Sequence, residues 1–520
     1  MRDFSLHERY RNKIMTAAEL SSVLSTHYKT QRTVMCHGVF DVVHPGHIRH
    51  LLFAKSKADI LIVSLTSDRH INKGHYRPHV PEDLRAINLA VLEFVDFVVI
   101  DFNATPIENL ELIKPHLFAK GYEYSPNQKI FPKTAEEADV VKAYGGEIIF
   151  TPGDFIMSSS EYINEFPPNL KIEKLMMLMD RSNVTFDDLR NTIGQFSKKE
   201  VHVIGDIIID TLSRCSMIGG QTKTPTLSIR LEDSLSFVGG AGIVAAHLRA
   251  AGAKVRITSI IGSDSYGKMA ESKLREWKVN THLILDSQRP TTHKNSYVVQ
   301  DYRLLKVDTV DNSAISDSQL LEICNDISSS TADCIVFSDF RHGIFNKRTI
   351  PALISSIPTN KVRVADSQVA SRWGNILDFP QFDLITPNER EARFSLGDQD
   401  SGIRAIASTI YQQSNCKMLI MKLGDKGIIT CTNPDASSLD SYFVMDSFVS
   451  QLRDPVGAGD ALLAYSTLAM LVTGNPVIAS ILGNLAAACE CEIEGNSPIT
   501  PNQILDKIDL ICNEVTYNAK

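Results

Sequence analysis

The chain has 520 residues, of which 43% are hydrophobic and 22% charged, and its formal net charge is −8. This length exceeds one ordinary hydrophobic core, so we expect two or three globular domains. Acidic and basic residues are interspersed without a long basic run, which argues against a nucleic-acid-binding or membrane-bound protein. The N-terminus lacks an apolar signal segment and the nine cysteines are mostly scattered, so we expect a cytoplasmic protein with reduced thiols.

The first predicted domain covers residues 15–165 and alternates apolar strands with helices. A helix opens at Thr16, where Glu19 stands three residues later in the pattern of a capping box. Runs that read as buried strands follow at residues 33–36, 59–65, 96–100 and 117–120. Such alternation is typical of an α/β domain with a parallel sheet, which binds ligands at the carboxyl ends of its strands.

A histidine pair lies where the first strand turns into a helix. Residues 38–47 read G-V-F-D-V-V-H-P-G-H, so that His44 and His47 stand beside the start of the helix. A helix N-terminus offers free N–H groups and the positive end of its dipole, which favour a phosphate. Two imidazoles at the same place can hydrogen-bond a polyphosphate, whereas outside this context the same letters describe a plain turn. Gly38 and Phe40 belong to the same candidate nucleotide-binding turn.

Other polar residues of this domain are candidates for the same site. A run of three serines precedes a short predicted helix, where the hydroxyls can cap the helix and contact a phosphate. The candidate binding residues are Lys73, Arg85, Lys120, Ser158, Ser159 and Ser160. The alternatives are that the two lysines are solvated loop charges and that the arginine is a surface residue of its helix.

These motifs carry a family resemblance. G-V-F-D-x-x-H-P-G-H, K-G-x-x-R-P at 73–78, K-G-x-E-Y at 120–124 and S-S-S at 158–160 resemble the nucleotidylyltransferase superfamily with its HxGH signature. Within it, the domain resembles the transferase half of the bifunctional heptose kinase/nucleotidylyltransferases of ADP-heptose synthesis. The resemblance implies a Rossmann-like fold in which His44 and His47 bind a triphosphate while a sugar or alcohol phosphate attacks the α-phosphorus. Pyrophosphate then leaves, with Mg²⁺ as the helper and no protein nucleophile.

A helical linker is predicted over residues 166–199. Two prolines at 167 and 168 close the pattern of the first domain, and residues 170–179 and 185–196 read as helices. The second of these opens at Thr185 with acidic residues in its first turn.

The second predicted domain covers residues 200–515 and is also α/β. Its predicted strands are residues 201–206, 333–338, 362–366, 384–386 and 418–422, each followed by a turn and a helical stretch. The strongest motif is G-A-G-D, formed by Gly457, Ala458, Gly459 and Asp460, directly before a helix. Small residues at a helix start form a nest of N–H groups for a phosphoryl group. The aspartate is placed to take a proton from an attacking hydroxyl, although the same letters can also form a tight turn.

This domain resembles the ribokinase-like (PfkB) carbohydrate kinases. The shared features are D-P-V-G-A-G-D at 454–460 and N-E-R-E at 388–391, which fits the family's N-x-x-E motif. The resemblance implies a ribokinase-like α/β domain with a small β lid, in which Asp460 is the base and Asn388 and Glu391 hold Mg²⁺ through water. ATP is the implied co-substrate, and a monovalent cation is a candidate activator. The resemblance also assigns Asp206, Gly239 and Gly240 to the sugar-binding half and residues 423–427, with Gly424, to the nucleotide-side loop. Residues 290–294 and the strand after them are the candidate for the small lid, and Asp210 and Lys294 are further candidate binding residues.

Three positions depart from the heptose kinases that the domain resembles. Ile243 stands where they have an asparagine, Asp366-Ser367-Gln368 replaces D-P-K, and Arg341-His342-Gly343 replaces A-K-G. The catalytic groups are kept and the substrate-side groups differ, which favours an active kinase with a changed sugar preference. The two domains also follow each other in the reverse of the order found in the bifunctional heptose enzymes.

We therefore expect a bifunctional enzyme that phosphorylates a heptose-phosphate-like sugar with ATP. Its other half is expected to transfer a nucleotidyl group from ATP or CTP to a sugar 1-phosphate. One alternative is a transferase regulated by a non-catalytic, sugar-sensing kinase-like half, and another is transfer from CTP to a polyol or glycerol phosphate. A homodimer is compatible with both resemblances. His247 and the Cys489/Cys491 pair are expected to be packing residues.

Overall fold

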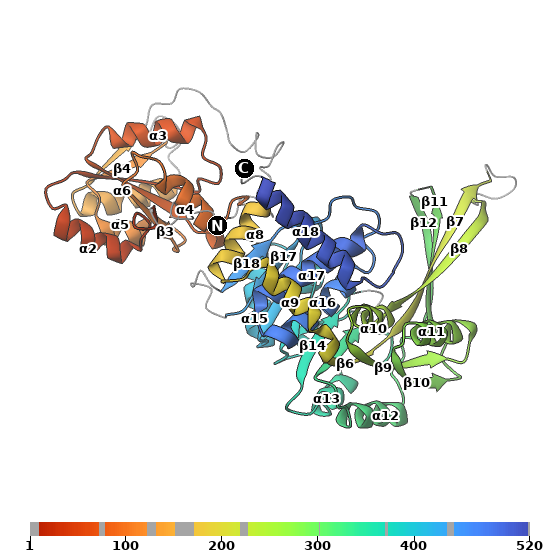
Figure 1. The fold of residues 1–520 in the computed structure, drawn as a ribbon. Helices are drawn as coiled ribbons and strands as arrows, with labels where there is room; N and C mark the ends of the chain where they lie inside the picture. Colours follow the sequence, from red (N-terminus) through yellow and green to blue (C-terminus); the bar gives the residue numbers. More distant parts are fainter. Residues whose placement is uncertain are drawn as a thin grey trace. The chain divides into compact units, whose positions relative to one another are not determined.

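The computed structural model describes residues 10–71, 78–121, 132–150, 171–218, 227–300, 302–369, 373–433 and 441–517. The chain divides into two compact units, Met1–Leu170 and Lys171–Lys520 (Figure 1). Among the described residues, no helix is long and apolar enough to cross a membrane.

The first unit is built on a five-stranded sheet in which every pairing is parallel. Its order is β3 (Phe97–Asp101), β2 (Ile60–Thr66), β1 (Thr33–Gly38), β4 (Leu117–Lys120) and β5 (Glu147–Phe150). The predicted alternation and parallel sheet are confirmed. The strand that the sequence did not reveal, β5, is short and only partly buried at the sheet edge.

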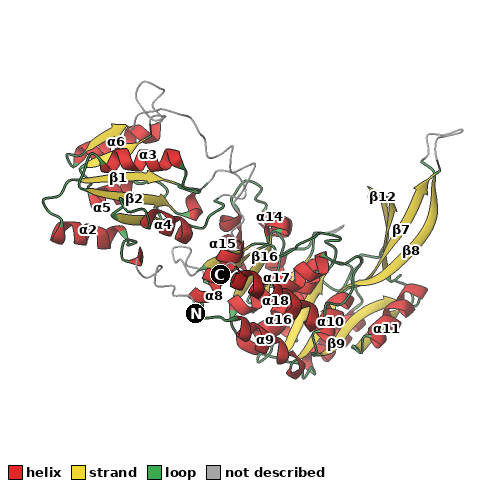
Figure 2. Ribbon diagram, turned by 45° about the horizontal axis from the view of Figure 1, so that its top comes forward, coloured by secondary structure: helices red, strands yellow, loops and turns green. Residues whose placement is uncertain are grey.

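Helices cover both faces of this sheet (Figure 2). Side chains alternate along β1, so that Val34 and Cys36 join one core cluster while Met35 joins the other. The first cluster includes α3 (Pro45–Lys55) and α4 (Glu82–Ala90), and the second includes α2 (Ala17–His27), α5 (Ile107–Ile113) and α6 (Pro132–Ala143). The predicted capping box opens α2, because Thr16 and Glu19 each accept the other's backbone N–H.

The second unit contains a nine-stranded sheet. Its order is β10 (Asn280–Asp286), β9 (Lys254–Gly262), β6 (Glu200–Gly205), β13 (Cys334–Asp339), β14 (Val362–Ser367), β15 (Leu384–Ile385), β16 (Met418–Lys422), β17 (Ile428–Cys431) and β18 (Tyr442–Met445). The strands from β10 to β16 run parallel and the last two pairings are antiparallel. The five strands that the sequence predicted here are β6, β13, β14, β15 and β16.

Two helical layers enclose this sheet. One core cluster contains α8 (Lys171–Arg181), α9 (Phe186–Gly194), α10 (Ala241–Ala250), α11 (Ser265–Glu276), α16 (Ala458–Thr473), α17 (Pro476–Cys491) and α18 (Pro501–Tyr517). The other contains α12 (Asp317–Ser328), α13 (Thr349–Ser355), α14 (Glu389–Leu396) and α15 (Ile403–Ser414). The helices expected in the linker, α8 and α9, therefore pack into the core of the second unit, through Leu175, Met179, Leu189 and Ile193.

A second sheet of four strands extends away from the body of the second unit (Figure 1). Its order is β12 (Tyr302–Thr309), β11 (Thr292–Val299), β7 (Ile207–Met217) and β8 (Ile229–Gly240), and we call it the lid sheet. The sequence located only the β11 part of this lid.

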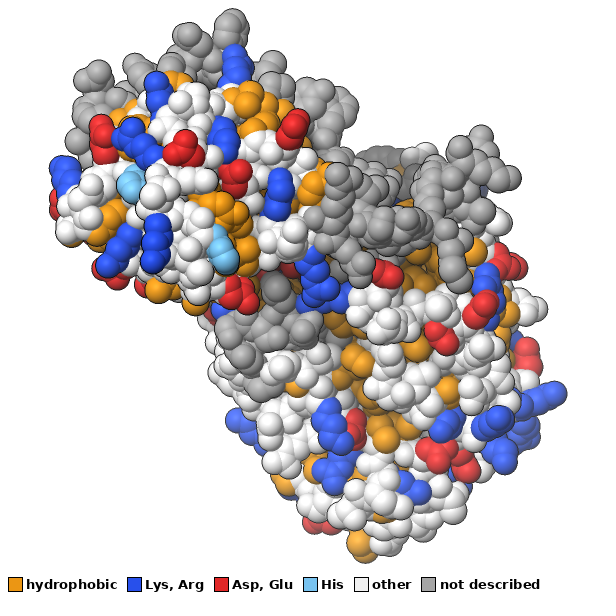
Figure 3. Space-filling view, turned by 60° about the vertical axis from the view of Figure 1, so that its left-hand side comes forward, with side chains coloured by type: hydrophobic (Ala, Val, Ile, Leu, Met, Phe, Trp, Pro, Cys, Tyr) orange, Lys and Arg blue, Asp and Glu red, His pale blue; other side chains and the backbone are white. Residues whose placement is uncertain are grey.

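Charge is mixed on the molecular surface. On the face drawn in Figure 3, lysine and arginine side chains are interspersed with aspartate and glutamate over the described residues. This distribution follows the interspersed charges of the sequence.

Two candidate active sites

The histidine turn of the first unit lies at the carboxyl end of β1. His44 is the N-cap of α3, and its Nδ1 accepts the backbone N–H of Gly46 at 3.1 Å. A Cβ on Gly46 would lie 2.8 Å from the His44 ring, so a larger residue there would displace the capping imidazole. The His44 and His47 ring centroids are 3.9 Å apart, and Phe40 packs edge-on against His47. The predicted pair is therefore brought together at a helix start.

Both imidazoles of this pair are held in the neutral form. Burial lowers the pKa of His44. Burial and the neighbouring His44 lower the pKa of His47 to about 4. Near neutral pH these rings act as hydrogen-bonding groups that do not repel each other, and the helix N-terminus supplies the positive end of a dipole.

Arg85 lies beneath the histidine turn and is completely buried. Its guanidinium donates to the carbonyl oxygens of Val39, Thr66 and Val80 and pairs with the Asp68 carboxylate. The interpretation of Arg85 as a surface residue is therefore wrong. Because these protein groups engage the guanidinium, we assign Arg85 to holding together the ends of β1 and β2.

Lys120 lies at the carboxyl end of β4, and its side chain is 11% exposed. It forms an ion pair with Glu137 of α6, so the alternative of a solvated loop charge is wrong for this lysine. A polar cluster that the sequence analysis missed lies at the same edge, where His37 Nδ1 is 2.9 Å from Ser64 Oγ. Burial and the charge of Lys120 lower the pKa of His37 to about 3. Lys73, Ser158, Ser159 and Ser160 lie outside the described residues.

In the second unit, the G-A-G-D motif forms the start of α16. Gly457 is the N-cap with φ of 85°, and Ala458, Gly459 and Asp460 form the first turn. Asp460 is buried, and its Oδ1 has no hydrogen-bond partner in the described part of the chain. Burial and the charge of Asp366 raise the pKa of Asp460 to about 8. A buried carboxyl in the first turn of a helix, with a pKa near neutrality, is suited to proton transfer.

The N-x-x-E motif lies at the start of α14. Asn388 is the N-cap and accepts the Glu391 N–H at 2.9 Å, while a Glu391 oxygen accepts the Asn388 N–H at 2.7 Å. Burial raises the pKa of Glu391 to about 7, although the positive charge of Lys422 opposes this shift. The described residues contain no cluster of three or more His, Cys, Asp or Glu side chains for a metal. Carboxylate and amide oxygens nonetheless fit Mg²⁺, which keeps several waters and shares its coordination with phosphates.

A pocket of about 730 Å³ opens beside these residues, a size typical of small-molecule sites. Its lining residues are Asn388, Glu389, Arg390, Arg393, Phe394, Gly397, Gln399, Lys422, Leu423 and Gly424. The pocket thus joins the N-x-x-E motif to the predicted nucleotide-side loop. Lys422, which the sequence analysis did not single out, donates to Asp366 Oδ1 at 2.8 Å.

The glycine pair predicted on the sugar side lies at the end of β8. A Cβ on Gly239 would lie 2.5 Å from Asp210 Oδ2, and one on Gly240, where φ is 59°, would overlap the Asp206 carbonyl. Asp210 on β7 is in register with Lys294 on β11, and burial lowers the pKa of that lysine. Asp210, Lys294 and Gly239 therefore lie beside one another on the lid sheet.

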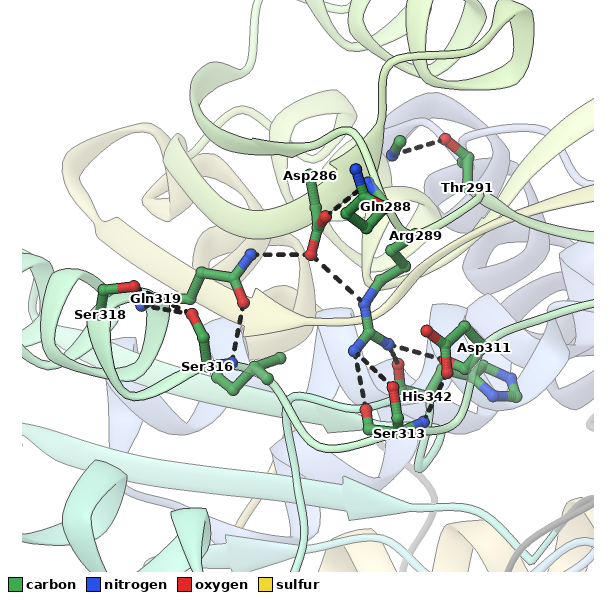
Figure 4. A network of polar contacts seen from close by, with 12 residues as sticks. Asp286, Gln288, Arg289, Thr291, Asp311, Ser313, Ser316, Ser318, Gln319 and His342 are labelled. Atoms are coloured by element: carbon green, nitrogen blue, oxygen red, sulfur yellow. Dashed lines mark hydrogen bonds and ion pairs between the residues drawn. The ribbon is translucent and has the colours of Figure 1, made fainter.

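Asp206 has a different local environment. Its Oδ2 accepts the backbone N–H groups of Phe340 and His342 at 3.2 and 3.1 Å. The carboxylate therefore holds the loop after β13. The same loop is fixed by Arg289, which donates to the carbonyl oxygens of Asp311, Ser313 and His342 at 2.7, 2.8 and 3.0 Å (Figure 4).

Two family models match the chain, one over each of its units. The model of the pfkB family of carbohydrate kinases matches residues 198–503, and a cytidylyltransferase-like model matches residues 35–165. The chain belongs to the pfkB family of carbohydrate kinases. Its cytidylyltransferase-like segment precedes the pfkB segment, in the reversed order that the sequence predicted.

Several curated relatives carry the name bifunctional protein HldE. The bifunctional protein HldE of Desulfatibacillum aliphaticivorans is 25% identical over 339 residues, covering 63% of this chain and 66% of that protein. HldE of Aliarcobacter butzleri is 37% identical over 147 residues, covering 28% of this chain and 31% of that protein. The chain thus matches less than two thirds of the length of these relatives. A phosphofructokinase-2 mutant from Escherichia coli has a TM-score of 0.50 at 15% identity, covering 60% of this chain and 99% of that chain, and shows the fold alone.

The structure shows the surroundings of two residues, Arg341 and Ile243, at which the pfkB segment departs from the heptose kinases. Arg341 is buried and pairs with Asp339 at 2.8 Å and Asp378 at 2.7 Å, so it stabilises its loop. Ile243 is completely buried in α10. His247, in the same helix, accepts the Ile499 N–H at 3.1 Å, which confirms that it is a packed histidine.

Proposed function

We propose that this chain is a bifunctional enzyme that phosphorylates a sugar with ATP and transfers a nucleotidyl group to a sugar phosphate. The observation that carries the proposal is the buried Asp460 carboxyl beside the G-A-G-D helix start, in a chain of the pfkB family. The name of the curated relatives and the histidine turn of the first unit support the second activity.

In the kinase reaction, a sugar hydroxyl attacks the γ-phosphorus of ATP. The new phosphorus–oxygen bond forms as the bond to ADP breaks, and the hydroxyl proton passes to the Asp460 carboxylate. Asp460 must first lose the proton that burial holds on it, because its pKa is about 8. The N–H groups at the start of α16 stabilise the charge on the transferring phosphoryl group. Bound Mg²⁺, held through water by Asn388 and Glu391, would shield the charge of the ATP phosphates.

In the transferase reaction, a phosphate oxygen of the sugar phosphate attacks the α-phosphorus of the nucleotide. The bond to pyrophosphate breaks, and no proton has to be removed from a phosphate that is already ionised. His44 and His47 donate hydrogen bonds to the developing charge, and the start of α3 orients the triphosphate. The donor is ATP or CTP and the acceptor a sugar 1-phosphate, with a heptose-phosphate-like sugar as the first substrate to try.

A second candidate is a transferase controlled by a kinase-like half that binds sugar without phosphorylating it. Ile243 favours this alternative, because an apolar side chain replaces a polar sugar contact. The buried base and the lysine beside it weigh against it, since a sensor needs neither. We also place the protein in a reducing, cytoplasmic compartment, a proposal supported by nine free cysteines.

The test is a panel of heptoses, hexoses, pentoses and their phosphates, each incubated with ATP or CTP and Mg²⁺. Mass spectrometry identifies sugar phosphates and nucleotide sugars. We expect one sugar class to give both products. Calorimetric sugar binding without any sugar phosphate would support the sensor alternative, and the absence of both products across the panel would overturn the proposal.

A further inference from the structure

The end of β14 lacks the lysine that the heptose kinases have, yet a lysine reaches the same point from another strand. Asp366 lies on β14, and Lys422 is the last residue of β16, which is separated from β14 by β15. The Lys422 ammonium donates to Asp366 Oδ1 at 2.8 Å, and Thr386 donates to the same oxygen at 2.8 Å. Asp366 therefore fixes a cation at the carboxyl edge of the sheet.

The position of this ammonium relates it to the G-A-G-D motif. A Cβ added to Gly459 would lie 3.2 Å from Lys422 Nζ, so the ammonium contacts the first turn of α16. Lys422 also lines the 730 Å³ pocket together with Asn388 and Gly424. It consequently lies between the pocket and the helix start that would receive the transferring phosphoryl group.

The charge around Lys422 is strongly negative. Burial alone would lower the pKa of Lys422, but the charges of Asp366 and Glu391 outweigh it and raise the pKa. The ammonium is therefore charged at neutral pH. It has three N–H donors, and Asp366 is the one acceptor for them among the residues that the structure describes. The remaining N–H groups are available to a ligand.

We propose that Lys422 binds the γ-phosphate of ATP and replaces the cation that is absent after Asp366. The inference rests on the proposed kinase function and assigns one further residue to that site. In the transfer step the bond between the γ-phosphorus and the leaving ADP oxygen breaks as the bond to the sugar oxygen forms. The sugar proton goes to Asp460, and Lys422 keeps its own protons and offsets the negative charge of the moving group. Asp366 is a positioning residue that orients the ammonium.

The test compares ATP with ADP, because only ATP carries the phosphate that Lys422 is proposed to contact. In the full-length chain, Lys422→Met is expected to weaken ATP binding roughly 10- to 100-fold and ADP binding less than about threefold, by calorimetry with Mg²⁺. The kcat for sugar phosphorylation should fall in the same variant and recover in part in Lys422→Arg. Equal weakening of ATP and ADP, or no weakening of either, would overturn the inference.

A matched control is available just before the same strand. Lys417 pairs with Asp383 at 2.7 Å, but its side chain is 80% exposed. Lys417→Met is expected to bind ATP and ADP as the wild type does, and a similar loss in this variant would point to a general charge effect and overturn the inference. If Lys422→Met does not fold, Lys422→Gln, which can still donate a hydrogen bond to Asp366, carries the same comparison.

The outcome separates this inference from the proposed function. If wild-type protein binds ATP but phosphorylates no sugar, the proposed kinase function fails. The ATP-to-ADP comparison still decides whether Lys422 holds the γ-phosphate. If phosphorylation is found and the Lys422→Met comparison shows no ATP-specific loss, the inference fails and the proposed function stands.

Discussion

Replacing Gly457 by alanine is expected to remove the kinase activity without unfolding the second unit. Gly457 begins α16 with φ of 85°, a conformation that L side chains rarely adopt. An added Cβ would overlap Asn496 Oδ1 and lie 2.9 Å from Glu490 Oε1. Both of these side chains are buried, so we expect the helix start to move away from them and to carry Ala458, Gly459 and Asp460 with it.

The size of the effect follows from two contributions. The positive φ alone costs an alanine about 1 kcal/mol. The overlap with Asn496 requires a shift on the order of 1 Å, and a misplacement of that size in a catalytic group lowers the rate roughly 100-fold. We thus expect a modest loss of stability and a large loss of sugar-dependent ADP formation.

The other end of the same helix provides a matched control. Gly474 is the C-cap of α16 with φ of 64°, and a Cβ there would meet no atom within 4 Å. The Gly474→Ala variant should lose only about 1 kcal/mol of unfolding free energy, because alanine adopts a positive φ there, and it should keep its kinase activity. Thermal melting and a coupled ADP assay on both variants test this. If Gly457→Ala keeps as much activity as Gly474→Ala, the assignment of the phosphoryl site to this helix start is refuted.

Three other results are expected. Arg85→Met removes a buried guanidinium that pairs with Asp68 and binds three carbonyl groups, so the first unit should lose about 3–5 kcal/mol of stability in denaturant unfolding, and a loss below ~1 kcal/mol would contradict its supporting role. Arg289→Gln releases the backbone carbonyls at the base of the lid sheet, so the KM for sugar should rise while the KM for ATP stays constant. The melting temperature of the second unit should fall between pH 6 and pH 9. Burial raises the pKa of Asp460 and Glu490 to about 8, so their contribution to stability is present at low pH and is lost as pH rises through that value; a higher melting temperature at pH 9 would contradict this.

Local patterns were enough to predict most strands of the first sheet, the central strands of the second and the two motif-bearing turns. Near-continuous apolar runs identified β1 and β16, and the Thr16 and Glu19 spacing identified a helix start. Each of these signals lies within a few neighbouring residues. The histidine turn and the G-A-G-D turn were found for the same reason, because the residues that shape each turn are consecutive.

Features that depend on tertiary contacts were missed. Half of the residues of the lid strand β8 are exposed, and the strand has no continuous apolar run to reveal it. Arg85 is buried because carbonyl groups from three separate segments surround it, and no sequence pattern encodes that arrangement. Lys422 and Asp366 are 56 residues apart and meet only because β14, β15 and β16 are neighbours in the sheet.

The central claim, that one chain carries two separate transfer sites, is tested by measuring both reactions in the same two variants. Asp460→Asn should lose sugar-dependent ADP formation and keep pyrophosphate release from the nucleotidyl-transfer reaction. The double variant His44→Ala with His47→Ala should show the opposite losses. If either folded variant loses both reactions, two independent sites are contradicted.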